Sequence, residues 1–289
     1  MIVITAPTGH IGSQLIKNLL EADEAVRLIV RDPTKVPANI REKVEVVVGS
    51  HGDPVVTKKA FKNADAVFWL VPPDPKAKSA ESAYVDFSRP ACESLMAEGV
   101  KHVVGVSSLG RNTPQATRAG NITASLMMDD LISSIGVNYR ALVCPSFMEN
   151  LLRQAASIKN DGVFSSPIKG ELKMATCATR DIAAMAARLL IDRSWAGTGE
   201  VPVPGPEDLS FHEMARVMSE VLGKTVRFQE SAIDTLKAEL LSIGRSEGMA
   251  QAVVDMTIAV NQGIYSNVPR ATVSDSATTF RQWCQEVLL

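Results

Sequence analysis

Short apolar runs alternate with amphipathic segments along the first half of the chain. The runs are rich in Val, Ile and Leu and occupy residues 1–4, 25–30, 44–48, 66–71, 102–107 and 138–143. Continuous apolar runs of this length are typical of strands that are buried on both faces of a sheet. The segments between them have helical periodicity, most clearly after residue 12 and over residues 80–99 and 119–134. Because alternating strands and helices build right-handed βαβ units, we predict a doubly wound parallel α/β sheet.

The pattern loosens beyond about residue 145. Helical periodicity continues over residues 180–190 and 211–222, and residues 200–204 read as a short strand. Ser210 and Glu213 have the spacing of a capping box, and Gly223 is placed to end that helix. Residues 231–262 are helical and rich in Met, Ala and Ile, which indicates core packing or a surface for a homo-oligomer. We therefore divide the chain into a first domain, residues 1–150, and a smaller α/β lobe, residues 151–289, interleaved with the first domain.

The first turn, residues 5–12, has the composition of a phosphate-binding turn between a strand and a helix. The free N–H groups of the first helical turn attract an anion, and glycines let a pyrophosphate approach the backbone. Ala6 stands where the three-glycine fingerprint of dinucleotide-binding folds has its first glycine, so an ordinary strand-turn-helix is the alternative. We assign to the dinucleotide the residues Thr8, Gly9, His10, Ile11 and Gly12.

Arg31 ends the second predicted strand, where Rossmann-like folds discriminate between dinucleotides. An acidic residue there binds the ribose 2′-hydroxyl of NAD, whereas a basic one accommodates the 2′-phosphate of NADP. Arg31 stays charged and its planar fork matches a phosphate, and Lys35 adds a second positive charge. The acidic Asp32 next to Arg31 leaves NAD as an alternative cofactor. The alternative interpretation of Arg31 is an ordinary solvent-exposed arginine. We favour NADP(H) as the cofactor.

Composition excludes several classes of partner. The 289 residues include 30 Lys and Arg and 32 Asp and Glu, which gives a formal net charge of −2 and no basic field for nucleic acid. Lys58, Lys59 and Lys62 share a helical face that we interpret as solvent-exposed. No apolar run reaches the roughly 18 residues of a membrane span. Because the first predicted strand begins at Met1, we expect no signal peptide. The cysteines and histidines are scattered, so we expect a cytoplasmic protein without a metal site.

Six segments, in order along the chain, resemble the NmrA-like family, a branch of the atypical short-chain dehydrogenase/reductases. They are residues 5–12, 30–33, 106–108, 145–150, 179–183 and 205–210. The resemblance implies an NADP(H)-binding fold with a small C-terminal lobe over the nicotinamide. Members include reductases of quinones, dyes and phenylpropanoids, and also non-catalytic redox sensors that bind a protein partner. Since ligands bind at the carboxyl ends of the strands in this fold, we also assign to the cofactor Val71, Pro72, Ser107 and Pro145.

The chain departs from typical short-chain dehydrogenases at the proton donor. Those enzymes carry a Tyr-x-x-x-Lys pair on the helix after the fifth strand, in which the tyrosine acts as the acid. The register from Gly136 places these two positions on Asn121 and Ser125, and the chain's three tyrosines have no lysine four residues later. We therefore expect no Tyr-Lys dyad and leave the catalytic residues unassigned.

The predicted substrate pocket contains Ser108, Phe147 and Asn150, which follow the fifth and sixth strands. The alternatives are a turn cap for Ser108, a core position for Phe147 and a helix cap for Asn150. An electron-poor acceptor takes hydride without an acid, and its proton arrives from water. We predict an NADPH-dependent reductase of a quinone, enone, iminium or dye-like small molecule. The alternatives are a non-catalytic NADP(H)-sensing regulator that binds a protein partner and an epimerase, isomerase or lyase that uses a bound cofactor.

Overall fold

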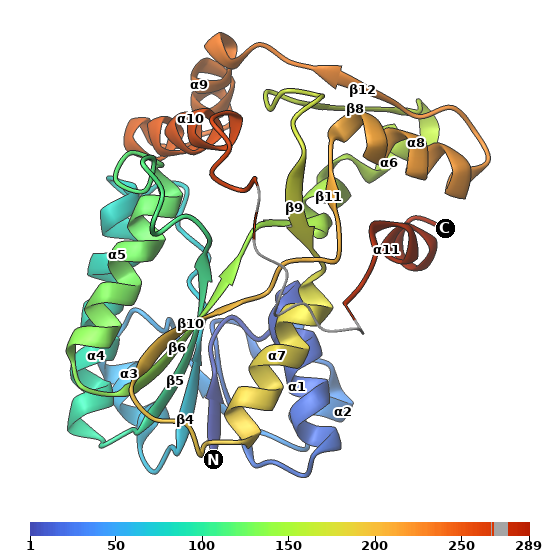
Figure 1. Cartoon of the computed structure of the whole chain (residues 1–289). Helices are drawn as coiled ribbons and strands as arrows, with labels where there is room; N and C mark the ends of the chain where they lie inside the picture. The colour runs from blue at the N-terminus through green and yellow to red at the C-terminus, as the bar shows by residue number, and fades with distance from the viewer. Residues whose placement is uncertain (267, 269–276) are drawn as a thin grey trace.

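A seven-stranded parallel sheet forms the centre of the molecule, as the computed structural model shows for residues 1–266, 268 and 277–289 (Figure 1). Its strand order is β10-β6-β5-β4-β1-β2-β3, which confirms the predicted doubly wound sheet. The strands are β1 (Ile2–Ile4), β2 (Val26–Val30), β3 (Glu45–Val48), β4 (Ala66–Trp69), β5 (His102–Ser108), β6 (Asn138–Cys144) and β10 (Thr198–Pro202).

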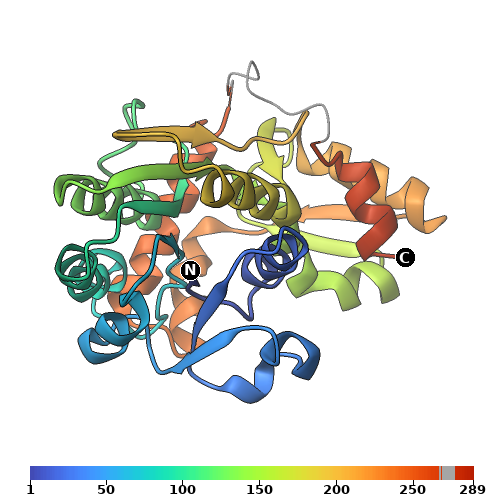
Figure 2. The ribbon, with the colours of Figure 1, turned by 90° about the horizontal axis from the view of Figure 1, so that it is seen from below.

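Helices cover both faces of this sheet (Figure 2). One face carries α1 (His10–Glu21) and α7 (Thr179–Ile191), and the other carries α3 (Pro54–Phe61), α4 (Phe87–Ala97) and α5 (Asn121–Ser134). Successive strand residues alternate between the two cores, so that Ile2 and Ile4 pack with α1 while Val3 packs with α3 and α4. Burial on both faces explains why the strands read as continuous apolar runs. Shorter helical elements are η1 (Pro33–Lys35), α2 (Ala38–Arg41), η2 (Ser82–Asp86) and η3 (Met148–Gln154).

Most of the chain after β6 lies over the carboxyl ends of the strands (Figure 1). Two small sheets, ordered β11-β9-β7 and β12-β8, are flanked by helices. These elements are β7 (Ser146–Phe147), α6 (Ala155–Asn160), β8 (Val163–Ser166), β9 (Met174–Cys177), β11 (Asp208–Leu209), α8 (Phe211–Leu222), β12 (Arg227–Glu230), α9 (Ile233–Ser242), α10 (Glu247–Asn261) and α11 (Phe280–Val287).

The C-terminal part also contributes to the first sheet. Strand β10 pairs with β6 in parallel, and α7 packs beside α1. The expected strand at residues 200–204 is therefore observed two residues earlier, as the edge of the large sheet. The capping box at Ser210 and Glu213 is confirmed, and Gly223 ends α8 with a left-handed φ of 64°. Within the described residues, no helix is long and apolar enough to cross a membrane.

Candidate functional site

The turn between β1 and α1 leaves the start of α1 accessible. Thr8, Gly9 and His10 are exposed, whereas Ile11 and Gly12 are buried. Gly9 precedes α1 with an extended backbone, and in the part of the chain that the structure describes the first helical turn has no side-chain cap and contains no acidic residue. Because the first N–H groups of a helix lack intrahelical acceptors, this helix start can bind an anion.

The two glycines of the turn have different surroundings. A Cβ on Gly12 would lie 2.8 Å from the Cα of Pro7 and closer still to the carbonyl oxygen of Ala6. Among the described residues, a Cβ on Gly9 would meet only the same oxygen, at 3.6 Å, which is ordinary contact. Gly12 is therefore required by the packing of the protein itself, whereas the packing leaves open space beside Gly9. This space lies at the helix start, where an anion can approach the first backbone N–H groups.

Arg31 and Lys35 are both exposed just beyond β2, the strand that adjoins β1. Within the part of the chain that the structure describes, Arg31 forms no ion pair. The neighbouring Asp32 accepts hydrogen bonds from the hydroxyl of Thr34 at 2.6 Å and from its backbone N–H at 3.0 Å. These bonds hold the pKa of Asp32 below its usual value. The carboxylate of Asp32 thus caps η1, while the guanidinium of Arg31 is available to a ligand.

His51 lies in the loop after β3 and had no motif to mark it in the sequence. Its ring packs edge-on against Trp69 and Phe87, with centroid separations of 5.2 and 4.8 Å. Burial lowers the pKa of His51 to about 4, so the ring is neutral at pH 7. Its buried Nε2 has no hydrogen-bond partner among the described residues. Val71 and Pro72, which the sequence assigns to the cofactor site, follow Trp69 at the end of β4. Val71 is buried and Pro72 is exposed.

The hydroxyl of Ser107 is engaged inside the protein. It donates to Asp129 of α5, whose other carboxylate oxygen accepts the hydroxyl of Tyr139 at 2.6 Å. The guanidinium of Arg111 lies 3.6 Å from the same carboxylate. Burial raises the pKa of Asp129 to about 6, against the opposing effect of these donors. In this arrangement, Ser107 can contact a cofactor through its backbone or by accepting a hydrogen bond at its hydroxyl oxygen.

Ser108, one residue later, has a different partner. Its hydroxyl donates to the carbonyl oxygen of Leu109 at 3.2 Å, and the same oxygen lies 2.8 Å from the hydroxyl of Tyr265, a residue that follows α10. Phe147 is half-buried after β6, Pro145 is buried, and Asn150 is exposed on η3. These residues follow β5 and β6, which are neighbours in the sheet. Sequence reasoning missed Tyr265 because no local motif connects it with Ser108.

Residues 145–150 and 179–183, two segments of the family pattern, form hydrogen bonds with α11 and the residues before it. Glu149 accepts hydrogen bonds from the hydroxyl of Thr179 at 2.8 Å and from the indole N–H of Trp283 at 3.2 Å. Asp181 accepts the backbone N–H and the hydroxyl of Thr278, each at 2.8 Å. These bonds connect η3 and the start of α7 with α11 and the residues before it. Their function is visible only in the three-dimensional structure.

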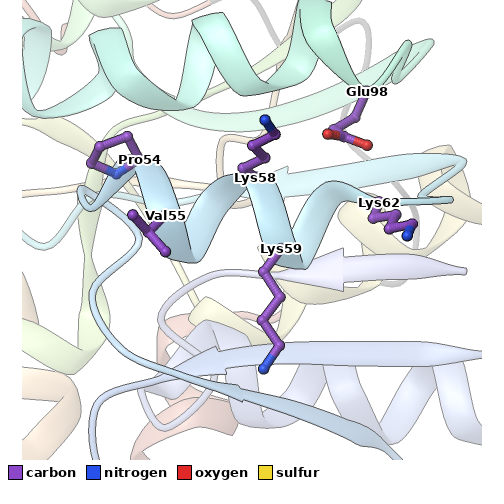
Figure 3. A pocket seen from close by; sticks show the side chains of 6 residues that line it. All are labelled: Pro54, Val55, Lys58, Lys59, Lys62 and Glu98. Atoms are coloured by element: carbon purple, nitrogen blue, oxygen red, sulfur yellow. The ribbon is translucent and has the colours of Figure 1, made fainter.

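A shallow hollow on α3 lies apart from the site (Figure 3). It is lined by Pro54, Val55, Lys58, Lys59, Lys62 and Glu98. The three lysines are exposed, which agrees with their interpretation as a solvated surface. No group of three or more His, Cys, Asp or Glu residues suited to a metal ion occurs among the described residues.

The parallel sheet and the open turn after β1 define a Rossmann-like α/β protein of the dinucleotide-binding type. The chain belongs to the NmrA-like family, whose model matches residues 1–281. A relative named NAD(P)H azoreductase, from Xenophilus azovorans, is 27% identical and aligns over 99% of this chain and 97% of its own length.

Two solved structures have the same fold over the full length of both chains. One is an NADPH-dependent quinone oxidoreductase from Escherichia coli in complex with NADPH, with a TM-score of 0.82 and 22% identity. The other is the triphenylmethane reductase of a Citrobacter species in complex with NADP(H), with a TM-score of 0.80 and 20% identity.

Proposed function

We propose that this protein is an NADPH-dependent reductase that transfers hydride to an electron-poor small molecule, such as a quinone, enone, iminium or dye-like acceptor. The observation that carries this proposal is the open helix start at Gly9 beside the exposed Arg31. Membership of a family that includes relatives named azoreductase and quinone oxidoreductase supports the choice of acceptors.

In the proposed complex, the turn from Thr8 to Gly12 holds the pyrophosphate at the start of α1. Arg31 pairs with the 2′-phosphate, and Lys35 adds a second positive charge at the same edge. We assign the walls of the cofactor site to Val71, Pro72, Ser107 and Pro145. The bound NADPH supplies the hydride, and these residues supply its position and orientation.

We place the acceptor between the cofactor and the C-terminal lobe. Ser108 and Phe147 follow adjacent strands, and Asn150 lies a few residues further along η3. Ser108 offers a hydroxyl, Asn150 an amide, and Phe147 an apolar ring that excludes water from the reacting atoms. In this arrangement, residues 1–150 contribute most of the cofactor site and residues 151–289 cover the substrate.

A titration followed by a turnover assay tests the proposal. Calorimetry should show tight binding of NADPH and much weaker binding of NADH. The NADPH complex is then mixed anaerobically with a panel of quinones, enones and cationic dyes, and NADPH absorbance is followed. Oxidation of NADPH by at least one acceptor is expected. Tight binding without any turnover, together with protein capture that depends on the redox state of the cofactor, would favour the sensing regulator instead.

A further inference from the structure

We propose that Tyr265 and Ser108 together form the hydroxyl pair that binds the acceptor's oxygen and delivers its proton. This inference rests on the proposed reductase function and narrows its substrates. The substrates are then acceptors that carry a carbonyl oxygen, and quinones are the test case. Tyr265 then performs the chemistry of the missing dyad from a different part of the chain.

The first support is the position of the two hydroxyl groups. Ser108 is the last residue of β5, and its Oγ lies 2.8 Å from the phenolic oxygen of Tyr265. Tyr265 is also close enough to Cys144, at the end of β6, and Cys177, at the end of β9, for these thiols to affect its pKa. The phenol therefore lies at the carboxyl end of β5 and close to that of β6, which are neighbouring strands of the large sheet, where ligands bind in this fold.

The second support is the way the Tyr265 segment is held. The carbonyl oxygen of Tyr265 accepts the N–H of Ala175 at 3.1 Å, and the hydroxyl of Ser266 donates to the carbonyl of Lys173 at 3.0 Å. A Cβ on Gly110 would come within 2.7 Å of Ile264. The side chain of Ile264 therefore packs directly on Gly110, which brings the residue before Tyr265 against the loop after β5.

The protonation state of Tyr265 permits hydrogen-bond donation, although the raised pKa does not by itself favour proton transfer. Burial raises the pKa of Tyr265 well above its usual value, although the hydrogen bond with Ser108 opposes this shift. The phenol is consequently protonated at neutral pH and can donate. A negative charge that develops on an acceptor oxygen would meet two hydroxyl donors, which stabilise it and assist proton transfer.

The proposed step is the reduction of a quinone to a hydroquinone. Hydride from NADPH brings two electrons and one hydrogen to the quinone, and the O–H bond of Tyr265 breaks as a new O–H bond forms on the quinone oxygen. The products are NADP⁺ and hydroquinone, and the phenolate regains a proton from water. A cationic triphenylmethane dye needs no such proton, because hydride addition to its central carbon already gives a neutral product. A comparison of the rates with these two acceptors therefore distinguishes an effect on hydride transfer from an effect on proton transfer.

The decisive experiment compares Tyr265→Phe and Ser108→Ala with the wild type on a quinone and on a cationic triphenylmethane dye. With the quinone, Tyr265→Phe should lower kcat by about 100-fold or more, and Ser108→Ala should also lower it. The Kd for NADPH should stay within about twofold, and the rate with the quinone should fall much further than the rate with the dye. Equal losses with both acceptors, or no loss with the quinone, would overturn the inference. Tyr84→Phe is the matched control and should leave the ratio of the two rates unchanged.

A binding readout tests the pair without turnover. The probe is 4-nitrophenol, whose absorbance reports its ionisation, added to the protein in the presence of NADP⁺. Two hydroxyl donors should lower the pKa of the bound phenol, and Tyr265→Phe should return that pKa towards its value in water. The same pKa in both proteins, or no difference in binding, would contradict the inference. Normal phenol binding by a protein that oxidises no NADPH would instead count against the proposed function.

Discussion

Gly12 at the start of α1 lies directly against the carbonyl oxygen of Ala6, with no room between them for a side chain. The substitution Gly12→Ala should therefore destabilise the whole fold, by roughly 1–3 kcal/mol, because the turn and α1 must separate to admit a methyl group. Urea unfolding measures this change. A variant as stable as the wild type would show that the turn relaxes easily and that the packing argument is wrong.

Gly9 should behave differently from Gly12. The substitution Gly9→Val places a β-branched side chain in the open space at the helix start, where we expect the pyrophosphate. We expect the variant to fold with nearly wild-type stability and to lose binding of both NADPH and NADH by calorimetry. Retained binding would mean that the phosphates lie elsewhere.

Ala6 adopts a left-handed backbone conformation, with a φ of 48°. Such a conformation costs an L-residue about 1–2 kcal/mol, whereas glycine adopts it freely. Replacing Ala6 by glycine removes this cost. The greater conformational entropy of glycine in the unfolded chain offsets about 0.4–1 kcal/mol of the stability gained. Ala6→Gly should therefore leave stability unchanged or raise it by up to about 1.6 kcal/mol, measured as a shift of the urea midpoint. Clear destabilisation would contradict the strain assigned to this residue.

Arg31 should select NADPH over NADH. Arg31→Ala removes a charge-assisted contact with the 2′-phosphate and should weaken NADPH by roughly 1–3 kcal/mol, with little effect on NADH. Titration calorimetry with both cofactors measures the two changes. Arg41→Ala, which removes another exposed arginine near the same edge, is the control and should affect neither. Equal weakening of NADPH and NADH by Arg31→Ala would refute the assigned role.

Asp129 should make stability depend on pH. Its folded pKa of about 6 lies above the ordinary value of 3.8, so the folded state favours the protonated carboxyl. The resulting contribution is fully present below about pH 4 and is lost as the pH rises through 6, which amounts to about 3 kcal/mol. The wild type should lose stability relative to Asp129→Asn across this window, as measured by urea unfolding. Asp130→Asn, at an exposed site, should show no such relative change, and parallel pH profiles for all three proteins would contradict the assignment.

The sheet could be predicted from the sequence because its strands are buried on both faces. Residues such as Val3 and Ile4 point to opposite faces, yet both meet apolar helices, so each strand appears as an unbroken apolar run. The turn after β1 was equally visible, since its glycines and its helix start are contiguous in the chain. Local chemistry of this kind needs no knowledge of the tertiary structure.

The remaining parts of the site depend on contacts between distant residues. The substitution of alanine for the expected glycine at position 6 left open whether the turn could form, and the backbone shows that it does. Ser107 and Ser108 are adjacent in sequence, yet one is bound to Asp129 of α5 and the other to Tyr265 after α10. A periodic pattern cannot distinguish these two environments. In the sequence, Tyr265 is therefore noticeable only as a tyrosine without a lysine four residues later.

Anaerobic oxidation of NADPH by a quinone, compared between the wild type and Gly9→Val, tests the central claim most directly. The claim is that the turn at the start of α1 holds the cofactor for hydride transfer. We predict that the wild type oxidises NADPH when the quinone is present, and that the folded Gly9→Val variant does not. Equal oxidation by both proteins, or none by the wild type with any acceptor of the panel, would contradict it.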